Sequence, residues 1–293
     1  MNVLNFPHAQ QQPDIDSHGL VVSGESKRGG HQLEIAGACG RKWALKHALG
    51  IPRVECPSLD DKTPAWQLGT LVHQGIANWL AVNMMCDKVT SPVNAITIRA
   101  EQLGASEAAV EQANELVVKY MNYVEETHPE WVCMAIEPQL VCDFGEELGL
   151  FTVGADAVFW DRKNLEPVIV DWKTAGRIQS NSNYKYSNQY TRYRMVLRNT
   201  ARANDKPDGW GKVIIGLIPT GKTNFPKRNL IEAPYFPFPV SGVEQQTADG
   251  LATLTFLEGQ DPHAIVYSCA TYGPECNGTY SPCPYRDSHC FIG

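Results

Sequence analysis

The sequence predicts an α/β domain in which a mixed central sheet, flanked by helices, follows a helical N-terminal portion. Three observations lead to this prediction. Helical periodicity dominates residues 34–126, strand-like runs dominate residues 131–172, and helices and strands are mixed thereafter. The chain of 293 residues is long enough for one large domain, and its 43% hydrophobic content suits an ordinary core.

The N-terminal portion is expected to contain a tail and three helices. Residues 1–30 are predicted to be a flexible tail, so that residues 31–293 form a single domain. The helices are expected over Glu34–Leu49, Trp66–Met85 and Ser106–Glu126. Gly50 and Pro52 end the first helix, and Ser106 caps the third.

Strand-like stretches follow the helices. They cover Trp131–Asp143, Phe151–Trp160 and Pro167–Trp172. The turn Asp161-Arg162-Lys163-Asn164 joins the last two, which predicts an antiparallel hairpin. Later elements are expected as helices at Tyr186–Asn199 and Val243–Leu257 and as strands at Val213–Ile218 and Leu230–Val240. Prolines interrupt the last strand, which places it at a sheet edge, and a loop rich in cysteine and proline begins at Asp261.

The charge distribution indicates a basic face on an acidic protein. The net charge of −7 argues against a generic basic nucleic-acid binder. Residues 173–228 nevertheless hold twelve Lys or Arg against Asp205 and Asp208, a net charge of +10 that leaves −17 for the remainder. This asymmetry favours a face that binds a polyanion, although a solvated charged surface would give the same count.

Signals for secretion or membrane insertion are not found in the sequence. No apolar run approaches the roughly 20 residues that span a bilayer, and the polar N-terminus has no signal-peptide core. A cytoplasmic location without a membrane partner is therefore expected. Disulfides are rare in that compartment, and nine is an odd number of cysteines, so a disulfide framework is not expected.

Two aspartates are predicted to meet across the hairpin. If the turn centres between Lys163 and Asn164, residues whose numbers sum to 327 lie opposite each other, as Asp156 and Asp171 do. Lys173 lies two residues beyond Asp171 and shares its face. Two carboxylates in an apolar sheet repel each other unless a cation lies between them, and Mg²⁺ or Mn²⁺ suits oxygen ligands. The alternative is a surface hairpin with both aspartates solvated and Lys173 paired with one of them.

These segments resemble the core of the PD-(D/E)XK nuclease superfamily. Asp171 and Lys173 occupy the (D/E)XK positions, and Gly154–Asp156 supplies the preceding acidic motif. Gly69–His73 resembles the upstream helix motif of the RecB-like branch, and Gln189–Tyr193 resembles the Gln-x-x-x-Tyr motif of that branch. All four segments occur in the order found in the family, and this order carries the inference more than any single motif.

The resemblance implies a restriction-endonuclease-like fold and a nuclease that requires Mg²⁺ or Mn²⁺. Asp156, Asp171 and Lys173 would be catalytic. His73 would join the two aspartates as a metal ligand, and Glu137 on the preceding strand could complete the coordination shell. The residues that position DNA would be Gln189, Arg192 and Tyr193.

Four cysteines are divided between the two ends of the chain. They are Cys39, Cys276, Cys283 and Cys290, and Cys269 could replace Cys276. This arrangement resembles the iron–sulfur RecB-like nucleases, which include CRISPR-adaptation nucleases and many phage exonucleases, and it implies a 4Fe-4S cluster that staples the chain ends. Four thiolates also suit structural zinc, but zinc sites usually show two C-x₂₋₄-C knuckles, which this chain lacks.

The resemblance implies an exonuclease that acts on single-stranded DNA or DNA ends in recombination, repair or replication, with proteins of those processes as partners. A phage origin fits a small stand-alone member of this kind, and the location would then be the host cytoplasm. Two alternatives stay open. One is a catalytically inactive, cluster-stabilised DNA-binding module, and the other is a zinc-tailed interaction protein.

Overall fold

The computed structural model describes residues 14–21, 28–50, 64–84, 88–175, 187–220 and 230–268. The chain divides into two compact units. The sheet unit comprises Met1–Glu25, Thr63–Cys142 and Val153–Val243. The helical unit comprises Ser26–Lys62, Asp143–Thr152 and Glu244–Gly293.

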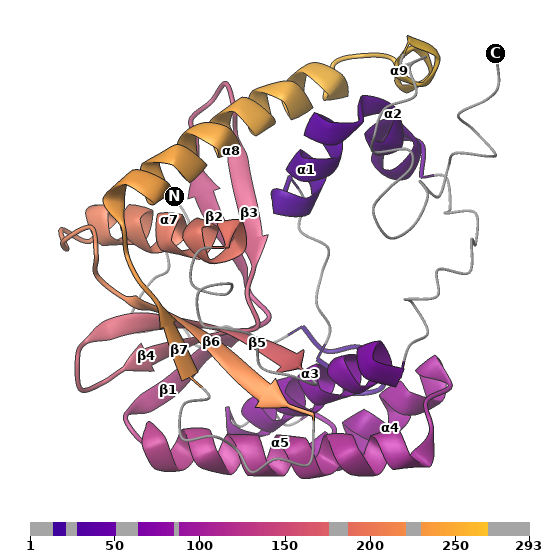
Figure 1. The fold of residues 1–293 in the computed structure, drawn as a ribbon, viewed down its shortest axis with the longest axis vertical. Coiled ribbons are helices and arrows are strands. Elements are labelled where there is room, and N and C mark those ends of the chain that lie inside the picture. The colour runs from indigo at the N-terminus through magenta and orange to yellow at the C-terminus, as the bar shows by residue number, and fades with distance from the viewer. Residues whose placement is uncertain are drawn as a thin grey trace. The chain divides into compact units, whose positions relative to one another are not determined.

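A five-stranded mixed sheet forms the centre of the sheet unit, with the strand order β1-β4-β5-β6-β7 (Figure 1). The strands are β1 (Trp131–Ile136), β4 (Ala157–Asp161), β5 (Glu166–Ala175), β6 (Lys212–Pro219) and β7 (Leu230–Ala233). β5 and β6 are parallel, and the other neighbouring pairs are antiparallel. The predicted mixed central sheet is therefore confirmed. β7 lies at an edge of it, although the prolines that led to this prediction follow β7 and are not part of it.

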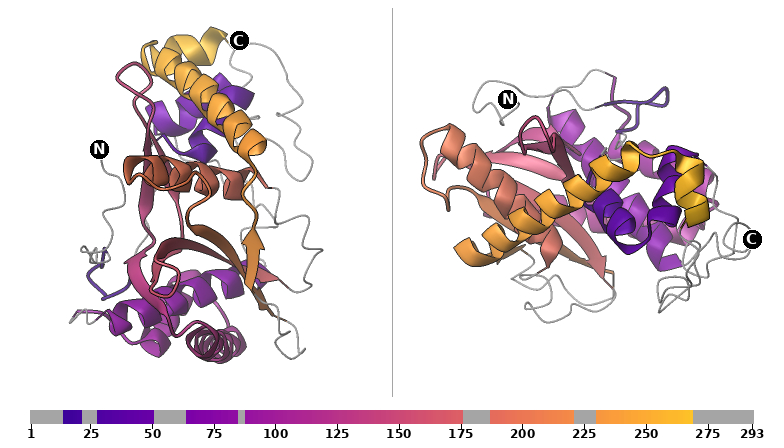
Figure 2. Two further views of the ribbon diagram at one scale, coloured as in Figure 1. Left: turned by 90° about the vertical axis from the view of Figure 1, so that its left-hand side faces the viewer. Right: turned by 90° about the horizontal axis from the view of Figure 1, so that it is seen from above.

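Helices cover both faces of this sheet. One face carries a layer of three helices, α3 (Pro64–Asn83), α4 (Pro92–Leu103) and α5 (Glu107–Thr127), in which α4 packs on α3 and α5. Leu71, Tyr120, Phe159 and Val170 represent the apolar cluster that these helices and the sheet bury together. The other face carries α7 (Asn188–Ala203), which contacts β6 (Figures 1 and 2). This arrangement matches the restriction-endonuclease-like architecture that was expected.

Residues 14–21 differ from the flexible tail that the sequence predicts. Leu20 and Val21 are each 2% exposed, and Val21 belongs to the core cluster. Asn78 of α3 donates from Nδ2 to the Gly19 carbonyl at 3.1 Å and accepts the Val21 N–H at 3.3 Å. The buried amide of Asn78 thus satisfies backbone groups of this segment, while the side chains of Leu20 and Val21 enter the core. The segment was predicted to be a tail because its average composition is polar.

Two of the predicted strands also need correction. The expected strand Leu230–Val240 ends at Ala233, because the helix α8 (Pro237–Glu258) begins at a proline, a residue favoured in the first turn of a helix. The expected strand Phe151–Trp160 contributes to two sheets. Its first part belongs to β3 (Leu150–Gly154), which pairs with β2 (Gln139–Asp143) in a separate two-stranded sheet.

The helical unit contains α1 (Gly30–Ala38), α2 (Gly40–Trp43), the π-helical segment η1 (Ala44–Ala48), α9 (Pro262–Ser268) and the later turns of α8. The predicted helix Glu34–Leu49 is interrupted at Cys39, whose extended backbone ends α1. Arg28 links three segments of this unit, since its guanidinium donates to the Leu148 carbonyl at 2.9 Å and to Glu258 at 2.8 Å.

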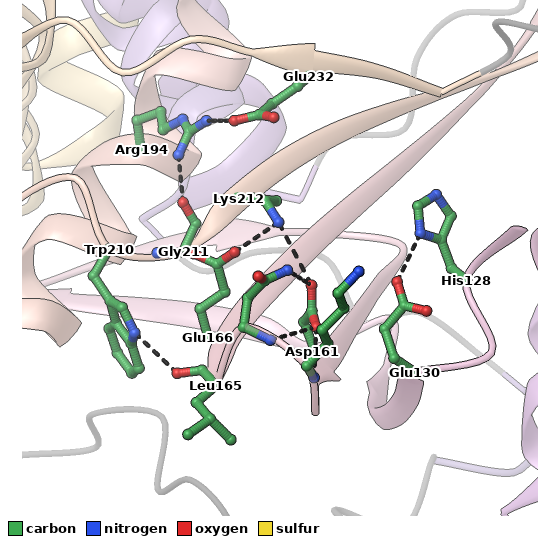
Figure 3. A network of polar contacts seen from close by, with 12 residues as sticks. His128, Glu130, Asp161, Leu165, Glu166, Arg194, Trp210, Gly211, Lys212 and Glu232 are labelled. Atoms are coloured by element: carbon green, nitrogen blue, oxygen red, sulfur yellow. Dashed lines mark hydrogen bonds and ion pairs between the residues drawn. The ribbon is translucent and has the colours of Figure 1, made fainter.

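The β4–β5 hairpin has the predicted register. Ala157 pairs with Val170 and Asp161 pairs with Glu166, so the paired residue numbers sum to 327. The Asp161 carboxylate, 1% exposed, accepts the backbone N–H groups that follow it in the turn at 2.9 Å. Figure 3 shows Lys212 of β6 beside it, 3.5 Å from Asp161 and 2.7 Å from Glu166. Asp161 therefore fixes the turn that sets which residues face each other at the far end of the hairpin.

Asp161→Ala is expected to lower the free energy of unfolding at neutral pH by about 2 kcal/mol, because charge-assisted hydrogen bonds are lost. Burial raises the pKa of Asp161, but hydrogen bonds from Asn164 and Lys163 and the charge of Lys212 outweigh it and hold the pKa below 3.8. The stabilisation is present above the unfolded value of 3.8 and is lost as the pH falls through the lowered folded pKa. Urea unfolding across this acid range should show the variant and the wild type converging.

Asp208→Ala is the matched control for this experiment. Asp208 makes an exposed ion pair with Arg202 at 2.8 Å, and a pair of that kind contributes less than about 1 kcal/mol. If Asp161→Ala lowers the free energy of unfolding by no more than Asp208→Ala does, the proposed role of Asp161 in holding the hairpin is contradicted.

Candidate active site

Asp171 and Lys173 lie on the face of β5 that is turned toward α7. Alternate residues of a strand share a face, and Lys173 Nζ lies 2.7 Å from Asp171 Oδ2. β5 is a central strand, so the Asp171 side chain is only 3% exposed, whereas that of Lys173 is 36% exposed. The ammonium group therefore lies at the solvent-accessible side of a buried carboxylate.

α7 presents three side chains to the Asp171 carboxylate. Gln189 Nε2 donates to Oδ1 at 3.0 Å, and the Tyr190 hydroxyl donates to Oδ2 at 3.3 Å. The Tyr193 hydroxyl lies 3.0 Å from Oδ1 and 2.7 Å from the Gly154 carbonyl oxygen, and its single proton serves one of them at a time. These contacts hold the orientation of Asp171 from outside the sheet.

Asp156 directly precedes β4, one residue beyond the last hairpin pair, Ala157 and Val170. Its Oδ2 accepts the Trp172 N–H at 2.5 Å, and its Oδ1 lies 3.6 Å from His73 Nδ1. Because His73 comes from α3, the site draws on both helical layers. The structure thus brings the predicted residues Asp156, Asp171, Lys173 and His73 into one group.

The pKa values of the two carboxylates of this group are shifted in opposite directions. Burial raises the pKa of Asp171, and the negative charge of Asp156 raises it further. Burial also acts to raise the pKa of Asp156, but the charges of His73 and Lys173 outweigh it and lower that pKa. Burial lowers the pKa of His73, yet the charge and contact of Asp156 raise it above 6.5. The buried carboxylate of Asp171 and the half-buried carboxylate of Asp156 therefore compete for negative charge, and a cation bound between them would relieve this competition.

The donor atoms of the site fit Mg²⁺ or Mn²⁺. Mg²⁺ is usually bound by one or two carboxylates, with water and substrate phosphate completing its shell, and Asp156 and Asp171 provide such a pair. Among the residues that the structure describes, no group of three or more His, Cys, Asp or Glu side chains could hold a metal ion by itself. The pair therefore fits an ion that takes its remaining ligands from solvent and substrate.

Two other predicted site residues, Glu137 and Arg192, are described at or near this group. Glu137 follows β1, has a φ of +46°, and donates its backbone N–H to the Asp156 carbonyl at 2.8 Å. It therefore supports the backbone that carries Asp156, and coordination by its carboxylate stays a prediction. Arg192 is half-buried on α7, and its contact with DNA stays a prediction as well.

Gly69 gives a physical reason for the spacing of the helix motif. A Cβ atom at Gly69 would lie 2.8 Å from Thr174 Oγ1, closer than real Cβ atoms approach. Thr174 follows Lys173 on β5, so the glycine allows α3 to approach the end of that strand. His73 lies one helical turn later and thereby reaches Asp156.

Gly69→Ala is expected to lower the catalytic rate roughly tenfold to a hundredfold, because displacing α3 from β5 moves His73 relative to Asp156. The measurement is the rate of Mn²⁺-dependent DNA cleavage, with the melting temperature as a check on folding. The double variant Gly69→Ala/Thr174→Ala removes the clashing hydroxyl and should recover most of the rate. Gly242→Ala on α8, where a Cβ has open space, should leave the rate unchanged. A double variant as slow as Gly69→Ala would show that the contact with Thr174 is not the reason for the glycine.

Comparison with known families agrees with this geometry. A family model for the PD-(D/E)XK nuclease superfamily matches residues 31–287. The chain belongs to the PD-(D/E)XK nuclease superfamily. Membership implies a metal-dependent nuclease that hydrolyses phosphodiester bonds of DNA, with Mg²⁺ or Mn²⁺ as the usual metal. A search of curated proteins finds no significant match. None of the described helices is long and apolar enough to cross a membrane.

Tyr190 was missed by the sequence analysis. It lies three residues before Tyr193, so both hydroxyls point from one face of α7 to the same carboxylate. This i, i+3 spacing of two tyrosines beside the motif glutamine was the available signal.

The predicted cluster ligands Cys269, Cys276, Cys283 and Cys290 lie outside the described residues. Cys39 is described, and its Sγ accepts the Lys42 N–H at 3.4 Å.

Proposed function

We propose that this protein is a Mg²⁺- or Mn²⁺-dependent deoxyribonuclease of the RecB-like branch of its superfamily. The observation that supports this most is that Asp156, Asp171 and Lys173 lie together on one hairpin. His73 of α3 lies beside Asp156 in the same group. The contacts of Gln189 and Tyr193 with Asp171 also support the RecB-like assignment, because these residues form the motif of that branch.

Each residue of the site has a chemical task in this proposal. Asp156 and Asp171 hold the metal, and His73 beside Asp156 is the further ligand that the RecB-like resemblance implies. The α7 side chains keep Asp171 in a fixed orientation. A bound divalent ion would lower the pKa of a water molecule and neutralise charge on the phosphate. Lys173, which is partly exposed beside Asp171, orients the attacking water and neutralises the charge that develops on the phosphate oxygens.

We propose further that cleavage is exonucleolytic and acts on single strands or DNA ends, as the RecB-like resemblance implies. The test compares linear and covalently closed circular single-stranded DNA of the same sequence in Mn²⁺. An exonuclease degrades the linear form and leaves the circle intact, and separate labels on the 5′ and 3′ ends give the polarity. Cleavage of the circle at the same rate would assign endonuclease activity instead.

The four-cysteine 4Fe-4S cluster is also a proposal. The position of Cys39 at the break between α1 and α2 supports it, because its Sγ already accepts a backbone N–H, as thiolate ligands of clusters commonly do. Anaerobic purification should yield a brown protein with about four iron atoms per chain, and Cys39→Ser should lose the colour. A colourless protein with one zinc ion would assign the cysteines to zinc. Comparing Cys269→Ser with Cys276→Ser identifies which of the two is a ligand.

A further inference from the structure

One face of α3 stays accessible to solvent where the helix approaches the candidate active site. On this face Trp66 is exposed, and Gly69, Thr70 and His73 are half-buried. The positions between them that belong to the core cluster are Leu68, Leu71 and Val72. Residues three, four and seven apart share one side of a helix, so the accessible positions form a continuous stripe that ends at His73. We call it the α3 stripe.

The α3 stripe continues past the end of the strand that carries Asp171. His73 lies beside Asp156, and Gly69, one turn earlier on α3, lies against Thr174, which follows Lys173 on β5. The start of α3 therefore lies in the direction in which β5 continues beyond Lys173. Trp66 lies seven residues before His73. This spacing places it about 10 Å away along the helix axis and within about 20° of the same direction.

Trp66 has the chemistry and the exposure for contact with a nucleobase. Its residue surface is 46% exposed, so the indole presents part of its ring to solvent. Gly69 and Thr70 are small, so no bulky side chain of the α3 stripe separates Trp66 from His73. The separation of about 10 Å corresponds to roughly three nucleotides at 3.4 Å per stacked nucleotide, or fewer in an extended strand.

We propose that Trp66 is a stacking platform for an unpaired nucleobase of the DNA strand whose phosphate lies at Asp156, Asp171 and Lys173. This inference rests on the proposed function on single strands or DNA ends, and it adds the residue that contacts an unpaired base of that substrate. Base–aromatic stacking tolerates any base because every base has a π-face. A closed duplex offers no free base face at this distance from its backbone, so Trp66 selects unpaired strands.

The test measures binding without hydrolysis and then cleavage. In EDTA, fluorescence anisotropy gives the affinity of wild type, Trp66→Ala and Trp66→Phe for a labelled single-stranded oligonucleotide and for its blunt duplex. Trp66→Ala should bind the single strand roughly tenfold more weakly, which is within the range of one stacked base, and Trp66→Phe should recover most of the affinity. Affinity for the duplex should not change. In Mn²⁺, KM for the single strand should rise by a similar factor while kcat stays near the wild-type value.

Two controls separate stacking from a general effect. Phe238→Ala removes an aromatic ring that is 91% exposed on α8 of the same unit, and it should leave binding unchanged. An oligonucleotide made of abasic residues should bind wild type and Trp66→Ala equally. Wild-type affinity and KM in Trp66→Ala, or equal losses on single strand and duplex, would overturn the proposal while the nuclease function stands. A wild-type protein that cleaves no DNA in Mn²⁺ would overturn the nuclease function itself.

Discussion

Lys173→Ala should lower the rate of Mn²⁺-dependent DNA cleavage by roughly 10²–10³-fold, the typical effect of removing one group that stabilises charge in a transition state. In the structure Lys173 Nζ lies 2.7 Å from Asp171 Oδ2 and is the partly exposed cation of the group. Folding should change little, because burial and the charge of Asp156 already raise the pKa of Asp171, which can take up a proton when the lysine is lost. Single-turnover cleavage and urea unfolding measure the two effects.

Lys119→Ala is the matched control for this lysine. Lys119 makes an exposed ion pair with Glu115 one turn away on α5, and such pairs contribute about 0.3–0.5 kcal/mol. Cleavage by Lys119→Ala should equal that of the wild type. Retained activity in a folded Lys173→Ala protein would remove the lysine from the proposed chemistry.

Asp171→Asn should abolish metal-dependent cleavage without destabilising the metal-free protein. Burial and then the charge of Asp156 raise the pKa of Asp171 above 3.8. The contribution of this group to stability is therefore fully present below the unfolded value and is lost as the pH rises through the raised folded pKa. Asparagine stays neutral, and with its carbonyl oxygen at the Oδ2 position it still accepts from Tyr190. Its amide NH₂ at the Oδ1 position can donate to the Tyr193 hydroxyl, which then donates to the Gly154 carbonyl, so the metal-free variant should be about as stable as the wild type at neutral pH.

Thermal melting with and without Mn²⁺ tests this second prediction directly. Wild type should melt at a higher temperature when Mn²⁺ is added, because an ion that binds only the folded state stabilises it, and Asp171→Asn should lose that shift. Asp249→Asn, an exposed carboxylate that accepts from Gln245, should behave as the wild type does. A full Mn²⁺ shift in Asp171→Asn would mean that the ion binds elsewhere.

The hairpin could be predicted from the sequence because its rule is local. A short turn between two apolar strands sets the register, and the register sets which residues face each other. The structure confirms the register of β4 and β5 as far as Ala157 and Val170, and Asp156 and Asp171 follow this pair closely enough for the charge of Asp156 to raise the pKa of Asp171. The i, i+4 spacing of Gln189 and Tyr193 likewise predicted one shared helical face, and both side chains reach Asp171.

Elements that depend on distant partners were harder to predict. α4 was not predicted because its buried residues, Ala95, Ile96 and Ala100, are few and mostly small, and their contacts come from α3 and α5. Residues 14–21 are ordered by Asn78, which is 57 residues away from Val21 along the chain. The contact of Tyr190 with Asp171 also requires α7 to lie across β5, a tertiary fact that no local pattern contains.

The most direct test of the central claim is a metal titration of DNA cleavage by the wild-type protein. The protein is stripped with EDTA, and Mg²⁺, Mn²⁺ or Ca²⁺ is then added to end-labelled single-stranded and double-stranded DNA. The two-carboxylate site with Lys173 predicts no cleavage without metal and cleavage restored by Mg²⁺ or Mn²⁺. Cleavage that persists in EDTA, or a folded and metal-loaded protein that cleaves neither substrate, would contradict the assignment of Asp156, Asp171 and Lys173 as a nuclease active site.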